Sequence, residues 1–190
     1  VLNSPHPHAQ VAAKTVAHHW FTVDHTSGQV DPEAEKEEEI EFDIPGHLAN
    51  KDLEAFKLGG AVFHRDAHCV TCHQPNGLGM PNIYPPLVDS PWVTGDEERI
   101  IKLTLHGLWG PIEVKGKQYL PEKGVPPMTA FGALLNDEEL AAVLTYVRNS
   151  WGNKAPVVSP GTVTKVRAAT KDRSIFWNPE ELLKLHPLKN

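Results

Sequence analysis

Cysteine and methionine are scarce in this sequence: its 190 residues contain two of each. With so few sulfur atoms, any candidate site that uses sulfur can be assigned to individual residues. Long apolar runs are absent, because nowhere do eighteen or more apolar residues follow one another, and the sequence predicts no membrane-spanning helix. The sequence as given opens at Val1 and not at a methionine, and its first residues do not have the pattern of a signal peptide. We expect a processed product or a piece of a longer chain.

Length and composition predict one domain with extensions, or at most two small domains. An apolar share of 40% is ordinary for a protein that buries a core. The net charge of −6 is concentrated in residues 31–43, where eight acids accompany one lysine, so the rest of the chain is close to neutral. This distribution argues against nucleic-acid binding. We interpret residues 31–43 as a solvated linker, with an acidic docking strip for a basic partner as the alternative.

One stretch, Cys69-Val70-Thr71-Cys72-His73, carries the clearest chemistry. Two thiols three residues apart on one helical turn can reach one edge of a porphyrin and bond its two vinyl groups. The histidine directly after the second cysteine is then placed under the iron, where imidazole nitrogen is a good ligand. The motif predicts one haem c attached through Cys69 and Cys72, with His73 as an axial iron ligand.

Three other interpretations of the two cysteines are weaker. A zinc site would need two more ligands, and the paired histidines (His6/His8 and His18/His19) lie upstream without the spacing of zinc fingers. A thioredoxin-like dithiol would need an alternating strand–helix pattern around it, which is missing. A disulfide within so short a loop has no evident purpose.

The first 30 residues contain five of the eleven histidines. A metal site there is the less favoured interpretation, because histidines without ligand spacing in a terminal segment are more often polar surface. Residues 16–23, around Trp20 and Phe21, have the aromatic and β-branched content of a short strand.

Helical periodicity predicts a first helix from about Asn50, a candidate N-cap, up to the haem motif. Its apolar face is formed by Leu53, Phe56, Gly60 and Phe63. A glycine on that face would allow another helix to approach closely. A second helix is expected between a capping box of Thr94 and Glu97 and the stop signal Gly107.

The remaining elements are predicted from turn and cap signals. After Gly110-Pro111, residues 112–115 alternate like a short strand. A third helix is expected from Asn136, with Glu139 completing a capping box. Two short helices are expected at residues 160–170 and 179–186, because each is preceded by an N-cap residue and begins with proline.

The segment after the motif is a loop rich in glycine and proline that includes Tyr84-Pro85-Pro86-Leu87. The carbonyl of Pro85 or Pro86 is well placed in sequence to accept from the His73 ring N–H. Such a bond would fix the tautomer and orientation of the imidazole. Three large side chains with one polar hydrogen each are candidates for contact with haem propionates, although burial in the core explains them equally well. They are Trp92, Trp109 and Tyr119.

The second axial ligand is expected from one of the two methionines. Met128 follows a long loop, is stiffened by Pro126 and Pro127, and precedes the third helix. Met80 lies on the loop that leaves the His73 side, so it would have to pass around the haem edge to reach the opposite face. We favour Met128, with an open or histidine-ligated position as the alternative.

His/Met ligation predicts an electron carrier. Both axial positions are filled, so oxygen or peroxide could bind only by displacing the sulfur. A thioether is also a soft, weak donor that favours ferrous iron.

In the order of these features the sequence resembles the class I cytochromes c. More narrowly, the stretch from about residue 56 to 188 resembles the cytochrome c domains that end large exported dehydrogenase-like proteins of planctomycete-type bacteria. The residues that carry this narrower resemblance are Cys69-Val70-Thr71-Cys72-His73-Gln74-Pro75, Tyr84-Pro85-Pro86-Leu87, the runs 105–111, 126–128 and 144–153, and the tail 181–188.

The resemblance implies a mainly α class I cytochrome c fold, with three core helices around one covalently bound haem. The first and third helices should cross near Gly60 and Tyr146. We expect an N-terminal extension and acidic linker over residues 1–45, the haem domain over 46–153 and a C-terminal helical extension docked on it over 154–190. The sequence departs from the family pattern where Phe63 stands six residues before Cys69 instead of four, so the turn into the motif is expected to carry an extra loop.

The implied function is transport of single electrons and not catalysis. The electrons would come from a partner dehydrogenase, fused to this domain in a longer protein, and pass to another cytochrome or an oxidase. The expected location is the periplasm or an equivalent compartment, and the expected exit is the exposed haem edge near residues 77–81. Pro86, Trp109 and Tyr119 are the expected haem surroundings. The alternatives are a haem enzyme with an open distal site, or a redox or gas sensor in which Met128 detaches.

Overall fold

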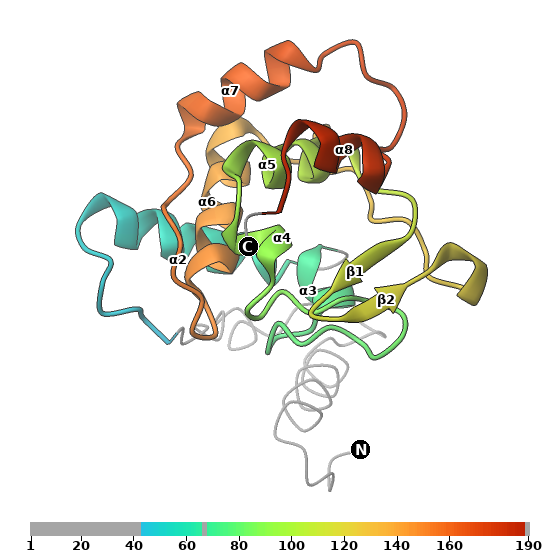
Figure 1. Ribbon diagram of the computed structural model, residues 1–190. Helices are drawn as coiled ribbons and strands as arrows, with labels where there is room; N and C mark the ends of the chain where they lie inside the picture. Colours follow the sequence, from blue (N-terminus) through green and yellow to red (C-terminus); the bar gives the residue numbers. More distant parts are fainter. Residues whose placement is uncertain (1–42, 66–67, 189–190) are drawn as a thin grey trace, which may run out of the picture. The chain divides into compact units, whose positions relative to one another are not determined.

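The computed structural model describes residues 43–65 and 68–188. The strand expected at residues 16–23, the histidine-rich first 30 residues and most of the acidic segment lie outside these ranges. Helices dominate the described part of the chain, together with one two-stranded sheet (Figure 1). The mainly α architecture predicted from the sequence is confirmed. In this part of the chain, no helix has both the length and the apolar character needed to cross a membrane.

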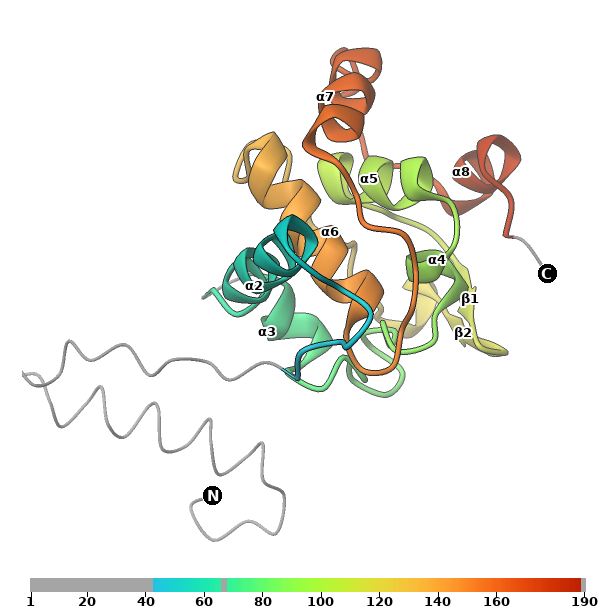
Figure 2. The ribbon, with the colours of Figure 1, turned by 90° about the vertical axis from the view of Figure 1, so that its left-hand side faces the viewer.

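Helices α2 (Lys51–Phe63) and α6 (Asp137–Asn149) form the most extensive pairing between elements (Figure 2). Their interface is aromatic: the ring centroid of Tyr146 lies 5.0 Å from that of Phe56 and 5.3 Å from that of Phe63. Both phenylalanines are fully buried. The expected crossing of the first and third helices is therefore present, and it buries the apolar face predicted for the first helix.

The glycine that touches α6 at this crossing is Gly59, the neighbour of Gly60, near which the crossing was expected, and both glycines are buried. A Cβ atom on Gly59 would lie only 2.0 Å from the carbonyl oxygen of Ala142 and 2.8 Å from the Cβ of Tyr146. Two neighbouring glycines point about 100° apart on a helix, and periodicity alone could not choose between them. The α6 backbone therefore packs directly on the α2 backbone at position 59.

The turn from α2 into the haem motif contains the extra loop that the position of Phe63 predicts. Helix α2 ends at Phe63 and α3 (Cys69–His73) begins six residues later, so α2 does not continue to the motif. Asn50 occupies the N-cap position of α2, but its side chain makes no capping hydrogen bond.

Helix α5 (Glu97–His106) follows the short helix α4 (Pro91–Thr94), and its N-cap is Asp96. The Asp96 carboxylate accepts from the backbone N–H of Arg99 at 3.0 Å. The predicted capping box of Thr94 and Glu97 is wrong, because Thr94 ends α4 and its hydroxyl donates to the Ser90 carbonyl at 3.1 Å. The predicted stop at Gly107 is confirmed, with φ of 77° at that residue.

The expected short strand is one arm of a hairpin. Strand β1 (Ile112–Val114) pairs antiparallel with β2 (Lys117–Tyr119), and a 3-10 helix, η1 (Pro121–Lys123), follows. Helix α6 then begins at Asp137 with the predicted capping box: the Asn136 side chain accepts from the Glu139 N–H at 2.9 Å, and the Glu139 carboxylate accepts from the Asn136 N–H at 3.2 Å.

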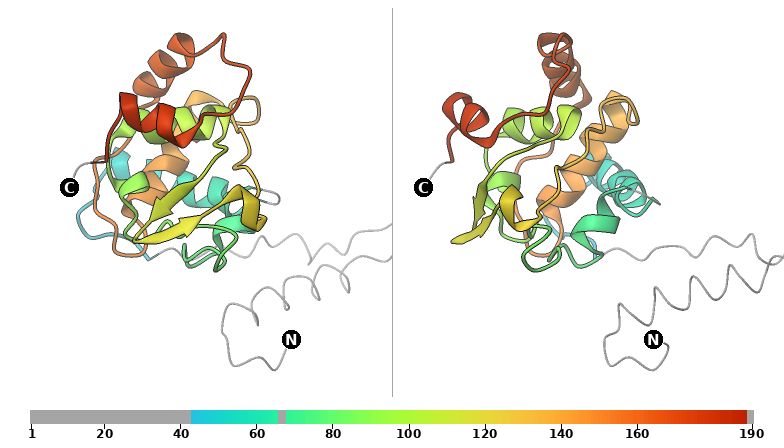
Figure 3. Two further views of the ribbon diagram at one scale, coloured as in Figure 1. Left: turned by 45° about the vertical axis from the view of Figure 1, so that its right-hand side comes forward. Right: turned by 90° about the vertical axis from the view of Figure 1, so that its right-hand side faces the viewer.

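Both expected tail helices are present as α7 (Pro160–Ala169) and α8 (Pro179–Leu185). The side chains of Ser159 and Asn178 cap them as predicted. Helix α7 packs against α5 and α6. Figure 3 shows α7 and α8 at the opposite end of the described domain from the loop that follows α3.

A buried arginine fastens the chain after α8 to the domain. The Arg99 guanidinium donates to the carbonyls of His186 at 2.9 Å, Pro187 at 3.0 Å and Pro91 at 2.6 Å. Its side chain is fully buried. These bonds join α4, α5 and the chain end at one position.

Candidate functional site

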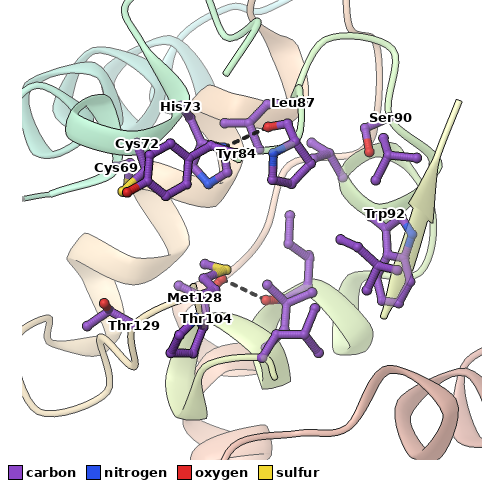
Figure 4. A pocket seen from close by; sticks show the side chains of 18 of the residues that line it. Cys69, Cys72, His73, Tyr84, Leu87, Ser90, Trp92, Thr104, Met128 and Thr129 are labelled. Atoms are coloured by element: carbon purple, nitrogen blue, oxygen red, sulfur yellow. Dashed lines mark hydrogen bonds between the residues drawn. The ribbon is translucent and has the colours of Figure 1, made fainter. Parts of the chain in front are cut away.

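The two cysteines and the histidine of the motif lie on one short helix, α3, so that Cys69 and Cys72 are one turn apart. Both thiols are unpaired and partly buried. Burial raises the pKa of the Cys69 thiol to about 11, so at neutral pH it is present as the thiol. Figure 4 shows Cys69, Cys72 and Tyr84 together at one edge of a cavity.

The ring of His73 points into this cavity and is held from behind by a main-chain carbonyl (Figure 4). Its Nδ1 lies 3.0 Å from the Pro85 oxygen. Because a carbonyl only accepts, Nδ1 carries the proton and Nε2 keeps its lone pair. Burial lowers the pKa of His73, and the bond to Pro85 offsets part of that shift. The imidazole is therefore neutral, the form that binds a metal.

The bond to Pro85 requires a glycine beside it. Gly79 has φ of 64°, and a Cβ atom there would lie 2.3 Å from the Tyr84 oxygen and 2.6 Å from the Pro85 oxygen. The N–H of Gly79 also donates to the His73 carbonyl at 2.9 Å. The loop after the motif thus folds back on α3 and presents the Pro85 carbonyl to the ring. The sequence did not decide whether the carbonyl of Pro85 or that of Pro86 accepts from His73. In the structure Pro85 makes this bond, and Pro86 lines the cavity.

Met128 lies across the cavity from His73, with its sulfur turned toward the imidazole (Figure 4). A pair of main-chain bonds with Leu108 holds it: the Met128 N–H donates to Leu108 at 2.9 Å, and the Leu108 N–H donates back at 3.2 Å. The other methionine, Met80, is 40% exposed and is not one of the cavity-lining residues. The structure therefore brings Met128, and not Met80, to the side opposite His73.

The cavity between these two side chains has a volume of about 300 Å³ and mostly apolar walls. Helix α5, strand β1 and helix α6 supply the walls through Ile100, Leu103, Thr104, Ile112, Val114, Val143, Leu144 and Val147. The described residues fit a covalently attached haem: two thiols at one edge, a neutral imidazole and a thioether on opposite sides, and apolar surface for the macrocycle between them.

The other predicted haem surroundings are only partly in place. Pro86 and Trp109 line the cavity, and Trp109 is 43% exposed. Tyr119 does not line it: the ring is buried in the core from strand β2, so its predicted contact with the cofactor does not fit. Trp92 lines the cavity, but its indole N–H donates to the Glu113 carbonyl at 3.0 Å and is already used.

The two histidines that flank the motif are placed differently from His73. The Nδ1 of His64 lies 2.9 Å from the Gly60 oxygen, one helical turn earlier. His68 is at the cavity edge, with its ring 5.6 Å from that of Phe131. His64 does not line the cavity, and its Nδ1 bonds within its own helix, whereas the ring of His73 points into the cavity.

Sequence reasoning did not assign a role to the residues that follow α6. The Trp151 indole N–H donates to the Pro75 carbonyl at 3.0 Å, and a Cβ on Gly77 would lie 2.5 Å from the Trp151 ring. Asn153 bonds to the loop that carries Pro85. The sequence did contain a signal for this role. Residues 149–153 are rich in polar and aromatic side chains, although a glycine alone would be enough to end the helix.

Comparison with known proteins agrees with this site. The family model for cytochrome c matches residues 56–151. The chain is 39% identical over 123 residues to cytochrome c-552 of Thermus thermophilus, which covers 62% of this chain and 87% of that protein.

Cytochrome subunits of dehydrogenases are also similar to this chain. It is 31% identical over 119 residues to the cytochrome c subunit of a quinone alcohol dehydrogenase from Gluconacetobacter polyoxogenes, covering 58% of this chain and 23% of that subunit. It is 31% identical over 118 residues to the cytochrome c subunit of gluconate 2-dehydrogenase from Pantoea cypripedii, covering 61% of this chain and 25% of that subunit. The chain thus matches about a quarter of each subunit.

The motif on α3, the cavity between His73 and Met128, and the match over residues 56–151 lead to one assignment. The chain belongs to the cytochrome c family, and its cofactor is one covalently bound haem c.

Proposed function

We propose that this chain carries single electrons through a haem whose two axial ligands are His73 and Met128. The observation that supports this most directly is the placement of the imidazole and the thioether on opposite sides of one cavity. With both positions filled, oxygen or peroxide can bind only by displacing the sulfur. The bound haem supplies one-electron chemistry at its iron.

The residues of the chain have separate roles in this proposal. Cys69 and Cys72 fix the cofactor, so that it stays bound when its charge changes. Pro85 orients His73 and strengthens it as a donor. Leu108 holds the main chain of Met128, so the sulfur needs little movement between oxidation states. The apolar walls from α5 and α6 keep water from the iron and favour the less charged state.

We further propose that the electrons come from a dehydrogenase and pass to another cytochrome or an oxidase. Relatives named as cytochrome subunits of dehydrogenases support the donor. The narrower resemblance supports fusion of residues 46–153, with the extension 154–190, to a larger exported protein of the planctomycete type, and hence an extracytoplasmic location.

The exit for the electron in this proposal is the edge of the haem next to the loop after α3. Leu78, Met80 and Ile83 on this loop are between 38% and 57% exposed. A small surface of exposed apolar side chains suits a weak and transient contact with a redox partner.

The test is carbon monoxide binding to the purified haem-loaded protein, together with its absorption spectrum. We expect the ferrous wild-type protein to resist carbon monoxide and Met128→Ala to bind it readily, with an altered spectrum in both oxidation states. Met80→Ala is the matched control and should behave as wild type, because Met80 is exposed outside the cavity. Ready binding by the wild-type protein would favour a haem enzyme or a gas sensor instead, and an unchanged Met128→Ala spectrum would remove Met128 as a ligand.

A further inference from the structure

The carbonyl that bonds to His73 belongs to a loop with little secondary structure of its own. Pro85 lies between Gly79 and Leu87 in a segment that has no helix. Within the loop, the N–H groups of Leu87 and Val88 both approach the Gly77 carbonyl, at 2.7 and 3.3 Å. These bonds close the loop on itself, but they do not fix its position relative to the rest of the domain.

One buried side chain that follows α6 ties the part of the loop after Pro85 to the rest of the domain. The amide of Asn153 accepts from the Asp89 N–H at 2.7 Å and donates to the Leu87 carbonyl at 3.1 Å. It also donates to the Val147 carbonyl at 2.8 Å, which ties the loop to the last turn of α6. Asn153 is 5% exposed, and these three bonds use both its oxygen and its NH₂ group.

The bonds from Asn153 hold the loop in a conformation that it would not favour alone. Asp89 has φ of 51°, a left-handed backbone conformation that costs a non-glycine residue free energy. The bond from its N–H to Asn153 is made in this conformation. The loop direction between Leu87 and Asp89 therefore depends on Asn153, and the direction of the Pro85 carbonyl depends on where Leu87 is held.

We propose that Asn153 is a positioning residue for the iron ligand His73, acting through Leu87 and the Pro85 carbonyl. This inference rests on the proposed function, because it concerns the ligand strength of His73. The bond from His73 Nδ1–H to Pro85 makes the imidazole a stronger donor, which stabilises ferric iron. Loosening the loop weakens that bond, and the midpoint potential rises.

The chain offers a matched control in Asn149, which lies four residues earlier. Asn149 is also buried, at 3% exposed, and its amide also makes two bonds, to the Thr145 carbonyl at 3.0 Å and to His47 at 2.8 Å. None of these bonds reaches the loop that carries Pro85. Asn149→Ala and Asn153→Ala thus remove the same group from the same end of α6.

The experiment compares the haem-loaded wild type, Asn153→Ala and Asn149→Ala by thermal unfolding, potentiometric titration and NMR of the His73 ring Nδ1–H. We expect both variants to unfold at lower temperature. Only Asn153→Ala should show a higher midpoint potential and faster solvent exchange of the Nδ1 proton, by about fivefold for the loss of about one hydrogen bond.

A further variant, Asn153→Asp, keeps the acceptor for Asp89 and loses both donors. Its buried carboxylate would face the Leu87 and Val147 carbonyls, so the loop should loosen and the His73 Nδ1 proton should also exchange faster with solvent. The inference is overturned if Asn153→Ala lowers only the unfolding temperature, or if Asn149→Ala shifts the potential equally. In either case a wild-type spectrum with His/Met ligation would leave the proposed function standing. A wild-type protein without that spectrum would instead refute the proposed function.

Discussion

Met128 and Leu108 exchange two main-chain hydrogen bonds, of 2.9 and 3.2 Å, so the segment with the proposed sulfur ligand is held like a strand beside residue 108. Leu108 also lies beside Trp177 in a parallel bridge. The N–H of Trp177 donates to Gly107 at 3.1 Å, and the N–H of Trp109 donates to Trp177 at 2.9 Å. Residues 107–109 thus stand between the Met128 segment and the C-terminal extension, and hold both.

Gly107→Ala should loosen Met128. Gly107 has φ of 77°, and an added Cβ would lie 2.5 Å from the Met128 oxygen and 2.6 Å from the Phe176 ring. The methyl group must push one of these segments away. We expect carbon monoxide to bind the ferrous variant more readily than the wild type, measured from the change in absorption.

The control for this variant is Gly124→Ala. Gly124 has a similar φ of 86°, but nothing lies within 4 Å of an added Cβ. Both variants share the backbone strain, about 1 kcal/mol, and only Gly107→Ala adds the clash. Equal carbon monoxide binding by the two variants would contradict the role of residue 107.

Asp137→Asn should lower stability at neutral pH and have little effect in acid. The Thr164 hydroxyl donates a hydrogen bond to Asp137, and this bond does most to lower the pKa of the carboxyl. The Arg167 guanidinium lowers it further, whereas burial raises it, and the pKa is below its ordinary value. A lowered carboxyl pKa adds stability above the unfolded value of about 4, and this is lost as pH falls through the folded value. We expect a difference of about 1 kcal/mol at pH 7.

Denaturant unfolding of the wild type and Asp137→Asn at several pH values measures this difference. The gap between the two proteins should narrow below pH 4 and close once the pH is below the folded-state pKa, where the wild-type carboxyl is protonated as well. A gap that stays constant from pH 7 down to strong acid would show that the charge of Asp137 is not what ties α7 to α6.

Arg99→Met should detach the chain that follows α8. The change removes donors from three carbonyls and leaves them in a buried site. We expect a loss of about 3 kcal/mol in unfolding free energy and faster proteolysis near residues 186–187. Lys184→Ala is the control, because its ion pair with Glu180 is exposed on both sides and should contribute nothing measurable. Equal protease resistance of Arg99→Met and wild type would contradict this.

Gly59→Ala should destabilise the protein strongly although the change adds one methyl group. The methyl would overlap the Ala142 carbonyl at the crossing of α2 and α6, and backbone atoms cannot rotate away. We expect a loss of about 3 kcal/mol, measured by thermal or denaturant unfolding. Gly46→Ala should be close to neutral, since nothing lies within 4 Å of its added Cβ. A small change in the unfolding free energy of Gly59→Ala would contradict this prediction, because it would mean that α2 and α6 can move apart without losing stability.

Features that depend on a few neighbouring residues could be predicted from the sequence. The caps at Asn136, Ser159 and Asn178 are local patterns, and each side chain makes the expected bond. The haem motif is likewise local, because its chemistry is contained in the spacing of Cys69, Cys72 and His73. Thr94 and Asp96 were both possible N-caps for α5. The backbone conformation selects Asp96, and the sequence pattern alone could not distinguish the two.

Features that depend on how distant segments meet were not predictable. Tyr119 belongs to β2, and whether it faced the cavity depended on how the hairpin packs against the core. The contact of Gly59 with the α6 backbone depended on the direction from which α6 arrives. Asn153 bonds to residues more than sixty positions earlier in the chain, and no spacing rule connects them.

The pairing of α2 with α6 also sets the order in which the site can be completed during synthesis. Val143, Leu144 and Val147 wall the cavity from α6, and the motif on α3 precedes them by about seventy residues in a chain made from its N-terminus. Until α6 has emerged, the thiols of Cys69 and Cys72 lack that wall and remain accessible. A haem could therefore be joined to the open chain first, and the first and last helices of the matched domain would then close around it.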